Sequence, residues 1–114
     1  MKRLLLIEED TDIREMVAFA FENNGYEIVK AAKDISADET VKINPHVIII
    51  GQGTETKLCS ELKSKDLTVA IPIIVYSPSI EVARINNKCV DAIVAKPFEL
   101  EDLVHIASRL AYKN

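Results

Sequence analysis

Leu4-Leu5-Leu6-Ile7-Glu8-Glu9-Asp10, residues 4–10 of the chain, joins a short apolar run to three acidic residues. The run has the length and composition of a buried β-strand, and the acidic residues end it. A membrane span would need about 18 apolar residues, and a signal peptide also needs a longer run than this one. The stretch therefore predicts a buried first strand with carboxylates at its carboxyl end.

The same kind of apolar run recurs along the chain, separated by segments with helical spacing. The further predicted strands are Tyr26 to Val29, Val47 to Ile50, Ile73 to Tyr76 and Ala92 to Ala95. Two helices have a clear apolar stripe, formed by Ile13, Met16, Val17, Ala20 and Phe21 in the first and by Leu100, Leu103, Val104, Ala107, Leu110 and Ala111 in the last. Three weaker helices are predicted over residues 36–43, 55–65 and 79–87. Strands that alternate with helices and are apolar on both faces predict a parallel sheet covered on each side, a (βα)5 sandwich.

The composition limits what the domain can do. With 114 residues, 48% of them apolar, the chain can form one domain over residues 1–114 with its own core. Its net charge of -4 and the lack of a basic run argue against direct nucleic-acid binding, and no segment predicts a membrane span. Cys59 and Cys89 have no CxxC spacing, so we interpret them as reduced, structural thiols of a cytoplasmic protein.

Polar residues follow the first, fourth and fifth predicted strands. Glu8 and Glu9 follow the first, Ser77 follows the fourth and Lys96 follows the fifth, whereas Gly51 follows the third. The carboxyl ends of parallel strands meet at one edge of a sheet, so these positions should converge. Carboxylates, a hydroxyl and an ammonium group in one crevice indicate a site for a divalent cation and a phosphoryl group.

Three segments carry a resemblance to a known family: residues 4–15, residues 72–77 and Asp91-Ala92-Ile93-Val94-Ala95-Lys96-Pro97-Phe98. In order and spacing they resemble the receiver domain of two-component response regulators, including the chemotaxis response regulator. The resemblance implies a flavodoxin-like three-layer α/β sandwich with a five-stranded parallel sheet in the order 2-1-3-4-5.

The resemblance also implies roles for the residues at the strand ends. Glu8 and Glu9 match the acidic pair that binds Mg²⁺ in the family, and Ser77 and Lys96 match the residues that hold the phosphoryl group. The phosphoacceptor aspartate falls on Gly51, which has no side chain that could form an acyl phosphate. Ile93 occupies the position of the aromatic switch residue. The phosphoacceptor, the loop that follows it and the aromatic switch residue are thus missing or altered.

We therefore expect a pseudo-receiver: a signalling module that is not an enzyme, has no cofactor beyond weak Mg²⁺ binding by Glu8 and Glu9, and acts by protein contact. Its partner would be another signalling protein or a second copy of the chain. Arg84, Ile106 and Arg109 are the candidate interface residues, because in similar proteins the surface formed by the fourth helix, fifth strand and fifth helix is the docking face.

Several alternatives remain open at this stage. The pocket could bind a small anion or other ligand through Lys96 and Ser77, or Lys96 could form an ion pair with Glu9 that closes the pocket. His46 and His105 have no surrounding constellation, so surface positions are expected for both. A conventional phosphorylated receiver would need an aspartate at the third strand end, and none occurs between Glu39 and Asp66.

Overall fold

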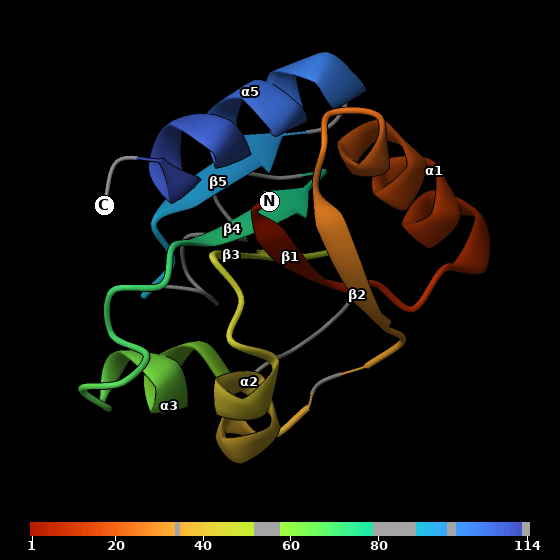
Figure 1. The fold of residues 1–114 in the computed structure, drawn as a ribbon. Helices are drawn as coiled ribbons and strands as arrows, with labels where there is room; N and C mark the ends of the chain where they lie inside the picture. The colour runs from red at the N-terminus through yellow and green to blue at the C-terminus, as the bar shows by residue number, and fades with distance from the viewer. Residues whose placement is uncertain (34, 52–57, 79–88, 96–97, 113–114) are drawn as a thin grey trace.

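Five strands form one parallel sheet with the order β2-β1-β3-β4-β5, as predicted (Figure 1). The computed structural model describes residues 1–33, 35–51, 58–78, 89–95 and 98–112. The strands are β1 (Arg3–Ile7), β2 (Glu27–Ala31), β3 (Val47–Ile50), β4 (Ile73–Ser77) and β5 (Ala92–Ala95), and the helices are α1 (Thr11–Glu22), α2 (Ala37–Ile43), α3 (Leu58–Lys63) and α5 (Leu100–Ala111). The helix predicted over residues 79–87 lies outside the described residues.

Among the described elements, α1 and α5 cover one face of the sheet, and α2 and α3 cover the other (Figure 1). Alternate residues of one strand therefore enter different cores: Leu4 and Leu6 belong to the cluster under α1 and α5, whereas Leu5 and Ile7 belong to the cluster under α2 and α3. Burial on both faces explains why the central strands β1, β3 and β4 contain continuous apolar runs, whereas the edge strand β2 exposes Glu27 and Lys30.

Local signals set the helix ends. The Asp10 carboxylate accepts a hydrogen bond from the Ile13 amide at 3.0 Å and so caps α1. Ser36 caps α2 in the same way, through the Glu39 amide at 3.0 Å. The helix therefore begins directly after the acidic residues at the end of β1.

The two cysteines correct one prediction. Cys59 of α3 and Cys89, which precedes β5, form a disulfide with an Sγ–Sγ distance of 2.19 Å and a Cα–Cα distance of 6.1 Å, so they are not the reduced thiols expected. They are 30 residues apart in sequence, and only the packing of α3 beside the entry to β5 brings them together. The two cysteines therefore no longer indicate a reducing compartment. Within the described residues, no helix is both long and apolar enough to cross a membrane.

Candidate functional site at the strand ends

Three strand ends form one row at the carboxyl edge of the sheet. Ile7 of β1 pairs with Ile50 of β3, and Ile50 pairs with Val75 of β4. One residue further along, the row continues with Glu8, Gly51 and Tyr76, and the Gly51 amide donates to the Ile7 carbonyl at 2.8 Å. Glycine thus lies between a carboxylic acid and a phenol on two flanking strands.

Glu8 and Tyr76 meet across this glycine. Neighbouring strands are about 4.8 Å apart, so side chains from β1 and β4 must bridge roughly 10 Å. The Tyr76 hydroxyl donates a short hydrogen bond to Glu8 Oε1, and both residues are buried, Glu8 with 2% exposure. Glu8 Oε2 accepts a second hydrogen bond from the Asp10 amide at 3.0 Å. Both carboxylate oxygens therefore have partners inside the protein.

The space beside Gly51 is filled by this pair. A Cβ atom at position 51 would lie 2.7 Å from Glu8 Cδ, 2.7 Å from the Tyr76 hydroxyl oxygen and in closer contact still with Glu8 Oε1. Such distances are well below van der Waals contact, so any side chain at position 51 would displace Glu8. The Glu8 side chain can consequently point inward only because position 51 has no side chain.

The environment keeps Tyr76 protonated. Burial raises the pKa of the Tyr76 phenol well above its ordinary value, and the hydrogen bond to Glu8 raises the pKa further. The ring packs against Phe98, with 5.5 Å between ring centroids. Tyr76 was expected only as a core residue, and its role as donor to Glu8 was missed. The signal was in the sequence, because Tyr76 lies next to the last residue of the strand that flanks Gly51.

The two glutamates at the end of β1 lie in different environments. Glu8 points into the protein, whereas Glu9 is exposed. The Arg14 guanidinium holds the backbone here, donating to the Glu8 carbonyl at 2.7 Å. Among the described side chains, no group of three or more His, Cys, Asp or Glu residues could hold a metal ion. With both Glu8 oxygens engaged and Asp10 capping α1, the described residues do not fit a Mg²⁺ site.

The remaining predicted site residues lie around this row. Ser77 is buried at the end of β4, where it pairs with Ala95. Ile93 is half-buried on β5 and packs against the cluster under α2 and α3. Lys96 and Arg84 lie outside the described residues, so the ion pair of Lys96 with Glu9 stays a prediction. His46 and His105 are exposed, as expected.

Comparisons with known proteins show which sequences and which folds the chain is similar to. PhoB, the phosphate regulon transcriptional regulatory protein of Pseudomonas aeruginosa, is 33% identical over 114 aligned positions, which cover 90% of the chain and 48% of PhoB. PhoB of Escherichia coli K12 is 28% identical over 111 positions with the same shares covered. By sequence and fold, the chain resembles the receiver domains of response regulators. It spans about half the length of the curated relatives that it matches. No protein-family model matches the chain.

Solved structures agree on the fold of this receiver. The receiver domain of a sensor histidine kinase from Pseudomonas aeruginosa, which has a magnesium ion in its active-site cleft, superposes with a TM-score of 0.80 at 17% identity, with 96% of the chain and 97% of that structure covered. Response regulator TrrA from Thermotoga maritima, in complex with Mg²⁺ and BeF, gives 0.76 at 22% identity, covering 96% and 99%. At these identities the likeness establishes the fold alone.

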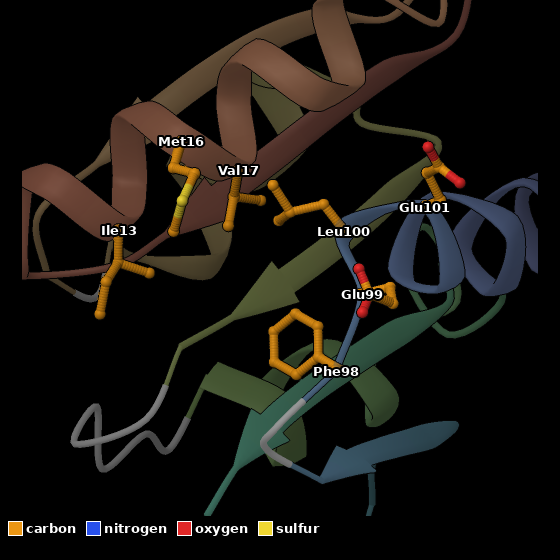
Figure 2. Close-up of a pocket in the computed structure, with 7 residues that line it drawn as sticks. All are labelled: Ile13, Met16, Val17, Phe98, Glu99, Leu100 and Glu101. Atoms are coloured by element: carbon orange, nitrogen blue, oxygen red, sulfur yellow. The ribbon is translucent and has the colours of Figure 1, made fainter.

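A second feature of the receiver is an apolar cavity of about 790 Å³ between α1 and the start of α5. Figure 2 shows α1 side chains on one flank, Phe98 and Leu100 opposite them, and two glutamates beside these. The lining residues are Ile13, Met16, Val17, Phe98, Glu99, Leu100 and Glu101. The sequence predicted a protein interface that includes Ile106 and Arg109 instead. Ile106 is half-buried against the core, and Arg109 is exposed. Met16 belongs to the apolar stripe that predicts the buried face of α1, but its side chain is 53% exposed.

Proposed function

We propose that this receiver is a phosphorylation-independent, non-enzymatic signalling module that acts in the cytoplasm through protein contacts. The single observation that supports this proposal is the Glu8–Tyr76 hydrogen bond across Gly51, which fills the space of an acceptor side chain. The sequence similarity to PhoB and the fold shared with response regulators support a role in two-component signalling. The activity of any longer protein that contains it is a separate question.

The chemistry of an acyl phosphate requires a carboxylate nucleophile with a reachable oxygen. Gly51 has none, and the nearest carboxylate in the described structure, Glu8, is buried with both oxygens hydrogen-bonded. Phosphorylation of Glu8 would break two hydrogen bonds inside the protein and bring a phosphoryl group into space occupied by Tyr76. Phosphoryl transfer to this edge of the sheet is therefore strongly disfavoured.

The same arrangement supports one fixed conformation. A ligand shifts a two-state equilibrium only if it binds the two states differently. Here the pocket is filled by side chains of the chain itself, and hydrogen bonds to a carboxylate are roughly twice as strong as neutral ones. The receiver would thus present one surface permanently, and regulation would come from the amount, location or partners of the protein.

Exposed apolar side chains on α1 support action by contact. Met16 and Phe19 are 53% and 65% exposed, and Met16 also lines the cavity beside α5. Glu99 and Glu101 add negative charge at the same cavity. A partner for this face would combine apolar and basic side chains. The face formed with Ile106 and Arg109 stays the alternative contact surface.

The ligand-binding alternative has no supporting observation among the described residues. The Glu8 carboxylate occupies the space at Gly51, and its negative charge would repel an anion bound there. We therefore do not propose an anion site.

The decisive experiment follows two readouts of the same protein. Two-dimensional amide NMR spectra would be recorded without ions and with Mg²⁺ plus beryllofluoride, and intact mass would be measured after incubation with phosphoramidate. We expect amide shifts no larger than those produced by sodium chloride and sodium fluoride, and no mass gain of a phosphoryl group. The Glu9→Gln variant controls for loose Mg²⁺ binding at the exposed carboxylate.

Two results would contradict the proposal. One is a set of shifts concentrated at Glu8, Gly51, Tyr76 and Ser77 that survives in the Glu9→Gln variant. The other is a stable phosphoryl adduct.

A further inference from the structure

The disulfide joins two elements that are also held together without it. Cys59 is 1% exposed in α3, whereas Cys89 is half-buried in the turn before β5. One helical turn beyond Cys59, the Lys63 ammonium forms an ion pair with Asp91 at 2.9 Å. Two links therefore connect α3 to the entry of β5, one covalent and one ionic.

The ionic link is part of a larger hydrogen-bond network. Lys63 Nζ also donates to the Ile71 carbonyl at 2.9 Å and to the Val69 carbonyl at 3.2 Å. Asp91 accepts from the Ile73 amide at 2.7 Å, which attaches it to the first residue of β4. These contacts, together with the β4–β5 pairing, fix the position of Cys89 relative to Cys59 independently of the sulfur–sulfur bond.

Both cysteines are also tolerated as thiols at these positions. Cys59 belongs to the apolar cluster under α2 and α3, and Cys89 packs against that cluster. A reduced cysteine behaves as a small apolar side chain, so the reduced domain would bury no unpaired charge or strong hydrogen-bonding group. The fold is thus compatible with both oxidation states.

We propose that Cys59–Cys89 is a reversible redox site, opened and closed by thiol–disulfide exchange with a dithiol of small-molecule or protein origin. The inference rests on the cytoplasmic action proposed above, because disulfides in that compartment are usually transient and redox-sensing. It does not depend on whether the receiver is phosphorylated, so the two proposals can fail separately.

The exchange begins at the more accessible sulfur. A thiolate of the dithiol attacks Cys89 Sγ, the Cys59–Cys89 bond breaks, and Cys59 leaves as a thiolate that takes up a proton. The second thiol of the reductant then attacks the mixed disulfide and releases Cys89 as a thiol. The domain gains two electrons and two protons, and the dithiol becomes a disulfide. Oxidation is the reverse exchange with an oxidised dithiol.

The test uses the native, folded receiver with dithiothreitol as the dithiol. Protein purified without reductant would be titrated with reduced and oxidised dithiothreitol in the absence of denaturant, with thiols counted by alkylation and intact mass. We expect one two-electron transition, and in the fully reduced protein the half-buried Cys89 should be alkylated before the buried Cys59. Closing a loop between residues 30 apart stabilises the native state, so reduction should lower Tm by about 10–20 °C.

A matched variant separates the disulfide from other effects of the reductant. The Cys59→Ser, Cys89→Ser double variant should melt near the reduced wild type, and its Tm should not respond to dithiothreitol. Amide shifts on reduction of the wild type should be largest in α3 and β5, with Glu8 and Tyr76 unchanged.

Three outcomes would overturn the inference. The first is two alkylatable thiols in the protein purified without reductant, since the bond would then not form. The second is a disulfide reduced only in denaturant, because such a bond is a permanent cross-link. The third is loss of amide dispersion on reduction, which would mean that the reduced state is unfolded.

Discussion

At the scale of single residues, the arrangement of Glu8, Gly51 and Tyr76 couples three positions that are far apart in the sequence. The glutamate and the tyrosine reach each other only because the residue between them on β3 lacks a side chain. Substitutions in this row should therefore have non-additive effects on stability.

The Gly51→Ala substitution tests this coupling. The new Cβ would force the Glu8 side chain out of its position and break its hydrogen bond to Tyr76, so we expect a loss of about 1–3 kcal/mol in the free energy of unfolding. In a Glu8→Ala background only the contact with the Tyr76 hydroxyl remains, so the same substitution should cost clearly less than it does in the wild type. Denaturant unfolding of the wild type, both single variants and the double variant measures the coupling. Additive effects would show that Glu8 does not occupy the space at position 51.

The Tyr76→Phe substitution tests the hydrogen bond to Glu8. It leaves one buried carboxylate oxygen without its donor, which should reduce stability by about 1–3 kcal/mol at neutral pH. The exposed Tyr112 provides the control, because Tyr112→Phe should change stability by less than about 0.5 kcal/mol. Equal effects of the two substitutions would contradict the assigned hydrogen bond.

The stability of the wild type should also depend on alkaline pH through Tyr76. Burial and the hydrogen bond to Glu8 raise the pKa of Tyr76 in the folded state, so the folded protein retains a proton that the unfolded chain releases above pH ~10. Stability from this residue is complete below that pH and falls above it, by up to about 1.4 kcal/mol per pH unit. Tyr26 also has a raised pKa, from burial. The difference in slope between the wild type and Tyr76→Phe therefore isolates Tyr76, and identical slopes would refute the raised pKa.

At the scale of elements, α1 uses its apolar residues for two purposes. One group, including Val17 and Phe21, is buried against the sheet, whereas Met16 and Phe19 face outward or line the cavity beside α5. Apolar side chains that add little to folding are candidates for contact with a partner.

Two phenylalanines of α1 form a matched pair for this distinction. Phe21→Ala should lower the free energy of unfolding by about 3–5 kcal/mol, because Phe21 is fully buried. Phe19→Ser should change it by less than about 0.5 kcal/mol, because the side chain is mostly exposed. Thermal unfolding of both variants gives the comparison. A large destabilisation by Phe19→Ser would make Phe19 a folding residue and remove it from the contact face.

At the scale of the whole molecule, one sheet separates two apolar clusters. Ile48 and Ile49 are adjacent in β3, yet Ile48 belongs to the cluster under α2 and α3 and Ile49 to the cluster under α1 and α5. Because both clusters share all the central strands, the domain should unfold in one cooperative step.

Substitution of each isoleucine by valine tests this cooperativity. Ile48→Val and Ile49→Val should each cost about 0.5–1.5 kcal/mol. Tyrosine fluorescence reports mainly on the cluster that contains Tyr26 and Tyr76, and far-ultraviolet circular dichroism reports on all helices. We expect both signals to shift together in both variants. Separate transitions would show that the two clusters unfold independently.

The amino-acid sequence by itself determined the architecture and the missing acceptor. Runs such as Val47 to Ile50, apolar on both faces, require a covered parallel sheet, and the order of polar residues at the strand ends places Glu8, Gly51 and Ser77 at one edge. The predicted bounds of the third and fifth strands match the structure.

Only the tertiary structure decided how the side chains at that edge are used. The sequence made Glu8 and Glu9 look equivalent, but the Asp10 cap and the strand register send one inward and the other to solvent. The Glu8–Tyr76 hydrogen bond and the Cys59–Cys89 disulfide join residues brought together by neighbouring strands and by helix packing. Periodicity along the chain reveals which face a residue lies on, whereas the partner that it meets there depends on which elements pack side by side.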